Sequence, residues 1–253
     1  MSASLPLPVF SVVIPTLQRS PDLRTLIEQC AANPLVLEVL IINNSTDPLT
    51  SESSKVRVIQ QDENIYVNPA WNLGAGEARG QYLAIINDDV RFDDEIFEYA
   101  RKLLRRGTFG MVGIDGSIIN KGGPRRITHR LATYEHVAIG FGMFMALRRE
   151  NYVTIPDEMK IWGGDDYLFL SQKRPNAVIR GTRFETDISV TSSSPEFQLM
   201  RLDELEKTNR NLGPIHGSRW WHAPSSYLAS IRRKRAQLKN RMAKSKRFRL
   251  EEG

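Results

Sequence analysis

The chain has 253 residues, of which 41% are hydrophobic, enough to form the core of one large domain or two small ones. Its single cysteine, Cys30, excludes an internal disulfide and a cysteine-based zinc site. No apolar run approaches the about 20 residues that span a bilayer, and residues 1–8 lack the basic region of a signal peptide. We therefore expect a cytoplasmic protein, or one that is peripheral at the inner face of a membrane.

The net charge of +6 comes from the C-terminal end of the chain. Residues 231–249 contain ten Lys or Arg side chains and no acid, so the rest of the chain carries a net charge of −4. The body is therefore expected to be a slightly acidic globule with a basic tail.

The first half of the chain alternates between strand-like and helix-like segments. We expect strands at 9–14, 37–42, 56–59 and 82–86, and helices at 21–33, 69–78 and 93–105. Near-continuous apolar strands that alternate with helices are typical of a parallel sheet buried on both faces. The predicted fold class is therefore α/β.

The second half is less regular. We expect strands at 109–114 and 138–147, a helix at 165–172 and a mostly extended segment at 178–190. From about Pro224 the pattern predicts a polar, basic helix.

Three polar segments follow predicted strands directly. They are Pro15-Thr16, Asn43-Asn44-Ser45 and Asn87-Asp88-Asp89. Ligands of open α/β sheets bind at the carboxyl ends of the strands, so these segments are expected to line one site.

The paired acids Asp88 and Asp89 are suited to a divalent cation. Carboxylates prefer hard cations such as Mg²⁺ or Mn²⁺, and such a cation would suit a diphosphate. Taken alone, Asn87-Asp88-Asp89 fits an acidic turn better. Its place among the other strand-end segments favours the metal interpretation.

A second acidic cluster is Trp162-Gly163-Gly164-Asp165-Asp166. Two acids at the start of a helix are also favourable N-terminal residues without any function. Alternatively, a carboxylate beside a Trp ring in a glycine-built cleft can accept a proton from a sugar or alcohol hydroxyl. The residues alone leave both interpretations open.

Four segments together resemble the GT-A glycosyltransferases, most closely family 2. Residues 12–16 resemble the first strand and nucleotide-binding turn. Residues 64–74 and 78–80 resemble the N-x-G-x-x-x-A-x-N-x-G…A-x-G stretch, Asn87-Asp88-Asp89 the DXD motif, and Trp162-Gly163-Gly164-Asp165-Asp166 the W-G-G-E-D motif. The resemblance covers roughly residues 9–190.

This resemblance implies a Rossmann-like, mostly parallel sheet flanked by helices, followed by a basic helical extension. It implies a catalytic domain over 1–215, with a donor half at about 9–115 and an acceptor half at about 116–215, and an extension over 216–253. The expected activity is metal-dependent, inverting transfer of a hexose or pentose from a nucleotide-diphosphate sugar to an acceptor hydroxyl.

The resemblance also implies roles for individual residues. The donor would be bound by Pro15, Thr16, Asn44, Asn64, Asn72, Arg79 and Asp88. Asp89, with Asp88, would hold Mn²⁺ or Mg²⁺. Asp166 would be the catalytic base, Asp165 would orient it or the acceptor, and Trp162 and Gly164 would contact the acceptor.

The chain departs from the family pattern at three places. Asn87 replaces the usual first acid, and Asn43-Asn44 replaces a commonly acidic pair. Residues 189–193 lack the His that often completes the metal site, which leaves His216 or His222 as candidate ligands.

The basic tail has three interpretations. With Trp220-Trp221 before it, residues 224–249 suit an anionic membrane surface, so the acceptor would be a glycan or a lipid-linked glycan. The same charges suit nucleic acid phosphates, which would make a hydroxylated base, as in viral DNA modification, the alternative acceptor. A solvated tail without a partner is the third interpretation.

Two rival functions make no use of a sugar acceptor. The acid pairs Asp88-Asp89 and Asp165-Asp166 argue against a non-catalytic nucleic-acid-binding protein, which gains nothing from them when it binds phosphates. The segment Trp162-Gly163-Gly164-Asp165-Asp166 argues against a nucleotidyltransferase, which needs no such acceptor-side motif.

Overall fold

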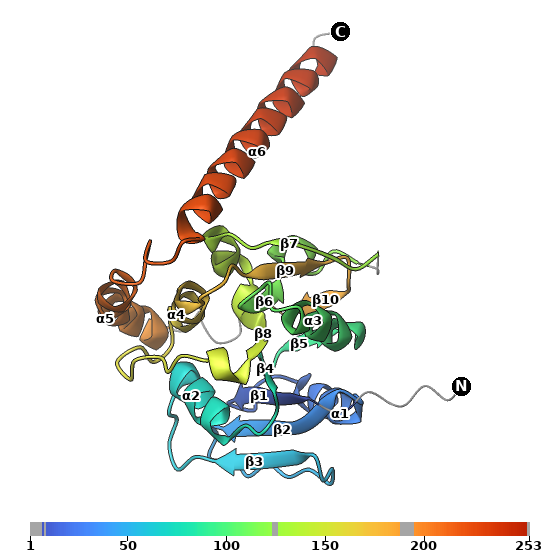
Figure 1. The fold of residues 1–253 in the computed structure, drawn as a ribbon, viewed down its shortest axis with the longest axis vertical. Helices are drawn as coiled ribbons and strands as arrows, with labels where there is room; N and C mark the ends of the chain where they lie inside the picture. Colours follow the sequence, from blue (N-terminus) through green and yellow to red (C-terminus); the bar gives the residue numbers. More distant parts are fainter. Residues whose placement is uncertain (1–6, 8, 123–125, 188–194, 252–253) are drawn as a thin grey trace.

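An eight-stranded sheet forms the centre of the protein, seen in a computed structural model that describes residues 7, 9–122, 126–187 and 195–251 (Figure 1). The strand order is β3-β2-β1-β4-β8-β6-β9-β7. The strands are β1 (Phe10–Thr16), β2 (Val36–Asn43), β3 (Val56–Gln60), β4 (Tyr82–Ile86), β6 (Met111–Ile114), β7 (Thr128–Leu131), β8 (Phe144–Arg148) and β9 (Ala177–Arg180).

The sheet is mostly parallel, as predicted. Strands β3, β2, β1 and β4 run in one direction, and β6 is parallel to β9. Strand β8 is antiparallel to both of its neighbours, and β7 is antiparallel to β9 at the edge. A separate two-stranded ribbon pairs β5 (Val90–Phe92) with β10 (Phe184–Thr186).

The sheet is buried on both faces because successive apolar side chains of its strands enter different cores. Val12 and Ile14 of β1 pack in one core, whereas Val13 packs in the other. Helices α1 (Leu23–Ala32) and α3 (Glu95–Arg105) cover the first core, and α2 (Val67–Glu77) and α4 (Gly164–Ser171) cover the second. This arrangement explains the near-continuous apolar strands of the sequence.

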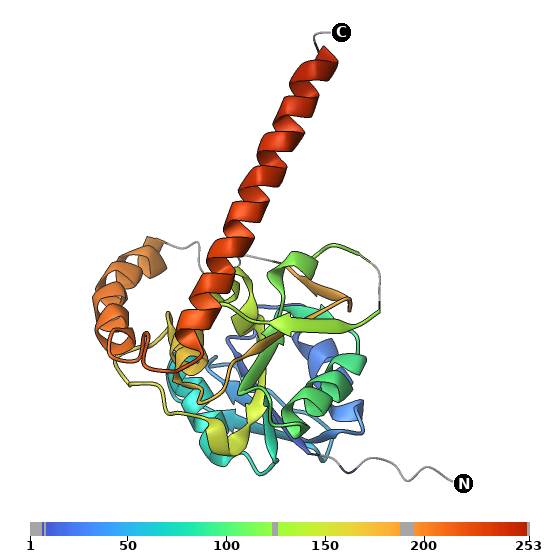
Figure 2. The same ribbon diagram turned by 45° about the horizontal axis from the view of Figure 1, so that its top comes forward.

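Two further helices follow the sheet. They are α5 (Pro195–Leu212) and α6 (His222–Glu251). Helix α6 starts against the body and then projects away from it (Figures 1 and 2). At its start, Ser225 donates a hydrogen bond to the carbonyl of Ala132, and Arg233 pairs with Glu135 at 2.6 Å. No helix in the described ranges is long and apolar enough to cross a membrane.

The segment 138–147, predicted as one strand, is only half a strand. Its first part belongs to the short 3-10 helices η2 (Tyr134–Ile139) and η3 (Phe141–Met143), and β8 begins at Phe144. Gly140 separates the two short helices with φ of +107°, a backbone conformation that glycine adopts readily. Two more short helices, η1 (Gly116–Ile118) and η4 (Arg149–Asn151), complete the described elements.

Candidate functional site

A pocket of about 470 Å³ opens at the carboxyl ends of β1, β2 and β4. All three strand-end segments contribute to it. Its lining residues are Pro15, Thr16, Leu17, Arg19, Ser20, Pro21, Asn44, Asn64, Tyr66, Val67, Asn87, Asp88, Asp89, Ile161 and Asp187. We call it the donor-side pocket. It brings together six of the residues singled out in the sequence, namely Pro15, Thr16, Asn44, Asn64, Asp88 and Asp89.

Asp88 is fixed by a hydrogen bond across two neighbouring strands. The Thr16 hydroxyl, at the end of β1, donates to Asp88 Oδ2 at 2.5 Å. Burial raises the pKa of Asp88 to about 6, although the Thr16 hydrogen bond opposes this shift. One oxygen of Asp88 is therefore committed to Thr16.

Asp89 lies opposite a carboxylate that the sequence analysis did not single out. Antiparallel pairing matches Thr186 of β10 with Val90 of β5, so the next residues outward, Asp187 and Asp89, face each other across the ribbon. Burial and the nearby Asp187 and Asp22 carboxylates raise the pKa of Asp89. Arg91 steadies this ribbon, since it pairs with Asp22 at 2.9 Å and with Asp187 at 3.6 Å.

The acids of this pocket suit a cation that also binds phosphate oxygens. Asp89 Oδ1 is buried and has no hydrogen-bond partner within the described part of the chain. No three His, Cys, Asp or Glu side chains among the described residues form a complete metal site. Mg²⁺ is commonly held by one or two carboxylates together with substrate phosphates and water, so Asp89 and its neighbours fit such an ion.

Asn64 and Tyr66, in the loop before α2, and Asn44, after β2, also line the pocket. Asn64 Oδ1 accepts a hydrogen bond from the Tyr66 backbone at 2.9 Å, and Asn44 Oδ1 accepts one from Ile65 at 3.3 Å. Tyr66 has φ of +68°, which is rare for an aromatic residue. Residues held in such conformations cluster at ligand sites.

The second acid pair lies in the first turn of α4. Gly163 precedes this helix with φ of +75°, and a Cβ there would come within 2.4 Å of Thr208. A Cβ on Gly164 would come within 2.0 Å of the buried Asn68 amide. The two glycines are thus required by packing, and they set the direction in which Asp165 and Asp166 leave the backbone. Gly164 is placed by this packing, and no described contact gives it a role toward an acceptor.

Both acids of this pair have a raised pKa. Burial and the Asp166 carboxylate raise the pKa of Asp165, and burial raises that of Asp166. The nearby Tyr134 hydroxyl opposes this rise in the pKa of Asp166. Tyr134, which the sequence analysis did not single out, thus lies beside the candidate base.

The two acid pairs approach each other across η3. The Asn87 backbone N–H donates to the Met143 carbonyl at 3.1 Å. A Cβ on the preceding residue, Gly142, would come within 2.6 Å of Asp165 Oδ2. Consecutive Cα atoms are about 3.8 Å apart, so η3 brings the loop of Asp88-Asp89 and the Asp165 carboxylate to the same part of the molecule.

Two predicted donor-binding residues lie elsewhere. Arg79 pairs with the buried Glu38 at 2.7 Å beside Ser11, at the start of β1 and therefore at the edge of the sheet opposite the pocket. Asn72 hydrogen-bonds to both the carbonyl and the N–H of Ile155. Both side chains are occupied in holding the fold, and neither lines the donor-side pocket.

The two candidate histidine ligands are also outside the pocket. His222 is buried, with its ring nitrogens on the Gly217 N–H and the Leu170 carbonyl, which leaves neither free for a metal. The His216 ring packs at a right angle to the Tyr134 ring, with 5.7 Å between centroids. Residues 189–193, where the sequence lacks the expected His, fall outside the described ranges.

The tryptophans before α4 and α6 differ from each other. The backbone N–H of Trp162 donates to Glu204 at 3.0 Å, and its neighbour Ile161 lines the donor-side pocket. Trp221 is buried and donates to the Gln172 carbonyl, so it is a core residue. Trp220, in contrast, is 72% exposed.

Residues 11–159 match the family model for glycosyl transferase family 2. The chain belongs to glycosyl transferase family 2. This match spans the sheet up to β8, including the donor-side pocket residues before Ile161. No curated protein sequence matches the chain closely enough to count as a relative.

Solved structures with the same fold include TarS of S. aureus, a similarity that fits the GT-A expectation. One TarS structure is 17% identical with a TM-score of 0.56, and the match covers 79% of this chain but only 40% of that chain. TarS 1–349 with UDP-GlcNAc is 17% identical with a TM-score of 0.56, covering 79% and 67% of the two chains. TarS 1–349 with UDP is 18% identical with a TM-score of 0.54, covering 79% and 66%.

Proposed function

We propose that this protein is a metal-dependent, inverting glycosyltransferase that moves a sugar from a nucleotide-diphosphate sugar to an acceptor hydroxyl. The observation that carries this proposal is the approach of two acid pairs, Asp88-Asp89 and Asp165-Asp166, on the two sides of η3. Family membership favours glycosyl transfer over the two rivals, nucleotidyl transfer and non-catalytic nucleic-acid binding.

The donor-side pocket would hold the nucleotide. Pro15, Thr16, Asn44 and Asn64 would surround the base and ribose, because they line its wall at the ends of β1 and β2 and in the loop before α2. Arg19, an exposed cation of the same pocket, would contact the diphosphate. The TarS structures with UDP and UDP-GlcNAc, which share the fold, support a nucleotide sugar as the donor.

Asp89 would be the main metal ligand, and Asp88 would contribute its second oxygen to the ion or the ribose. Asp187, which faces Asp89 across the ribbon, would add negative charge near the ion, in place of His216 or His222. A bound Mn²⁺ or Mg²⁺ would neutralise charge on the departing nucleoside diphosphate. The Asp187 carboxylate already pairs with the Arg91 guanidinium at 3.6 Å, so it would interact with both Arg91 and the ion.

Asp166 would be the general base. It would accept the proton of the acceptor hydroxyl while the acceptor oxygen bonds to the anomeric carbon and the bond from that carbon to the diphosphate oxygen breaks. A single in-line displacement inverts the anomeric configuration. Asp165 would orient the base, since its Oδ1 accepts a hydrogen bond from the Asp166 backbone at 3.0 Å. Trp162, four residues before Asp166, would stack on the acceptor.

The acceptor would be a glycan or a lipid-linked glycan at an anionic membrane surface. The ten cations of residues 231–249, with Trp220 and Tyr227 at 72% and 68% exposure near the start of α6, support this choice. Nucleic acid with hydroxylated bases is the alternative, because the same cations suit its phosphates. Cosedimentation with phosphatidylglycerol vesicles and titration with oligonucleotides, before and after deletion of residues 224–253, separate the two.

A donor screen with Mn²⁺ tests the activity itself. We expect release of nucleoside diphosphate from one or a few nucleotide sugars, with a product whose mass gains one hexose or pentose. Release must be lost in Asp89→Asn and Asp166→Asn, whereas Asp62→Asn, an exposed acid, serves as the control. Turnover that persists in both site variants would contradict the mechanism.

A further inference from the structure

A second pocket of about 450 Å³ shares no lining residue with the donor-side pocket. We call it the basic pocket and define it by Lys121, Arg126 and Arg180 together with the hydroxyl residues Ser117, Thr128 and Thr182. No Asp or Glu is among the described residues that line it. We propose that the basic pocket binds a phosphate group of a ligand other than the sugar donor.

The pocket is built by segments that are far apart in the sequence. In the antiparallel pair of β7 and β9, Thr128 lies directly opposite Arg180, so their side chains share one face of the sheet. Gly181 follows with φ of +80°, and a Cβ there would come within 2.3 Å of the Arg126 carbonyl. Glycine thus lets the turn after β9 close onto the start of β7.

One cation of the pocket, Arg180, is held in place by a buried carboxylate. Asp115 is fully buried, and its Oδ2 contacts Arg180 Nε at 3.1 Å and Arg130 Nη2 at 2.6 Å. The single negative charge of Asp115 thus neutralises only one of the two positive charges on Arg130 and Arg180. Although burial opposes it, hydrogen bonds from Ser117 and the charge of Arg130 lower the pKa of Asp115, which stays ionised.

The other two cations of the pocket have no acidic partner. Lys121 and Arg126 are exposed, and neither side chain forms an ion pair within the described residues. With the unmatched charge of Arg130 and Arg180, the surroundings of the pocket carry a formal charge of about +3. Guanidinium and ammonium groups around one cavity are groups that proteins use to bind phosphate, whereas the Thr182 hydroxyl already donates to Asp93 at 3.5 Å.

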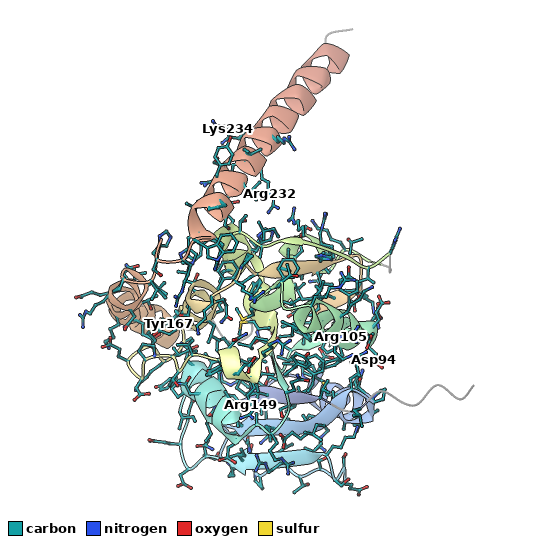
Figure 3. The ribbon with its side chains drawn as sticks, in the orientation of Figure 1. Asp94, Arg105, Arg149, Tyr167, Arg232 and Lys234 are labelled. Atoms are coloured by element: carbon teal, nitrogen blue, oxygen red, sulfur yellow. The ribbon has the colours of Figure 1, made fainter. Side chains whose placement is uncertain are left out.

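The excess of positive charge continues to α6. Arg232 donates to the Leu131 carbonyl at the other end of β7. Burial and the nearby Arg130 lower the pKa of Arg232, so these cations repel each other in the protein alone. Figure 3 places Arg232 on the part of α6 near the body and Lys234 farther out along the helix. A bound anion would relieve this repulsion.

The basic pocket and the donor-side pocket are lined by residues from the two ends of β10. Thr182 lies just before β10, whereas Asp187 lies just after it, and five residues of extended chain span about 16 Å. Asn120, which precedes Lys121, forms two hydrogen bonds to the Thr186 backbone and lines neither pocket. The phosphate is therefore expected on a separate molecule.

Titrations with sn-glycerol 1-phosphate, followed by ³¹P NMR, test the proposal on the full chain. We expect the double variant Lys121→Gln/Arg126→Gln to weaken binding about tenfold for each lost cation. The control double variant Arg24→Gln/Lys173→Gln removes two exposed cations elsewhere and must bind like wild type. Asp89→Asn must also leave this binding unchanged, which separates it from the proposed donor site.

A second titration, with phosphatidylglycerol vesicles, distinguishes a soluble phosphorylated ligand from a lipid headgroup. Binding of the small phosphate that depends on Lys121 and Arg126 supports a phosphorylated soluble ligand. Vesicle binding with the same dependence, and no binding of the small phosphate, supports a lipid headgroup. If neither ligand binds, or if both double variants bind equally well, the proposal is wrong.

Discussion

The Tyr134 hydroxyl of η2 lies beside the Asp166 carboxylate in the first turn of α4 and lowers the pKa of that carboxylate. The Thr133 hydroxyl and the His136 side chain cap η2 reciprocally, and the His216 ring packs against the Tyr134 ring. The hydroxyl group of Tyr134 is therefore held in one place. It favours the ionised form of Asp166, which is the form that a general base needs.

Tyr134→Phe should move the acidic limb of the pH profile of kcat/KM to higher pH. Burial already raises the pKa of Asp166, and loss of the Tyr134 hydroxyl raises it further. Because the base works when ionised, activity at low pH falls more than activity at high pH. Tyr227→Phe, at an exposed tyrosine, is the control. An equal loss at every pH would show that Tyr134 has only a structural role.

Asp166→Asn and Asp165→Asn should differ in their effects on kcat. Loss of the general base at Asp166 should lower kcat by about 10²- to 10⁴-fold. An Asn at 165 still accepts the hydrogen bond from the Asp166 backbone, so its effect should be about tenfold. Nucleoside diphosphate binding, measured by calorimetry, should be unchanged in both variants. Larger damage from Asp165→Asn would exchange the two proposed roles.

Binding of Mn²⁺, followed by EPR in the presence of UDP, should depend on both Asp89 and Asp187. We expect Asp89→Asn to abolish measurable binding and Asp187→Asn to weaken it about tenfold, since the ligand charge sets cation affinity. Asp62→Asn, at an exposed acid, should bind like wild type. Unchanged affinity in Asp187→Asn would remove this residue from the metal site.

Arg79→Ala should lower the free energy of unfolding more than Arg57→Ala does, without changing donor affinity. It leaves the nearly fully buried Glu38 without its guanidinium partner, although the 69% exposure of Arg79 limits the loss. Arg57→Ala breaks an exposed pair with Glu77 and should cost less than about 1 kcal/mol. Urea unfolding measures both. Weaker UDP binding in folded Arg79→Ala would restore its predicted donor role.

Local patterns were sufficient to predict the half of the sheet formed by β3, β2, β1 and β4, and the residues of the donor-side pocket at its strand ends. Strands β1, β2 and β4 are apolar runs with polar residues directly after them, so Thr16, Asn44 and Asp88 could be placed from the sequence. The helix over 21–33 was also predicted, because its four buried residues recur at helical spacing.

The remaining site residues depend on contacts between distant segments. Asp187 faces Asp89 only because β10 pairs with β5, and Tyr134 reaches Asp166 from a short 3-10 helix without a clear sequence period. Conversely, Arg79 matched a family pattern, but the buried Glu38 binds it at the other end of the sheet. Strand pairing and buried charge are not encoded in a local pattern.

Calorimetric titration of UDP, GDP, dTDP and ADP, with and without Mn²⁺, tests most directly whether the donor-side pocket binds a nucleoside diphosphate through a metal. We expect wild type to bind at least one of the four, only with Mn²⁺, and Asp89→Asn to lose this binding while its circular dichroism spectrum stays unchanged. Equal affinity in wild type and Asp89→Asn, or affinity independent of Mn²⁺, would contradict the proposed site.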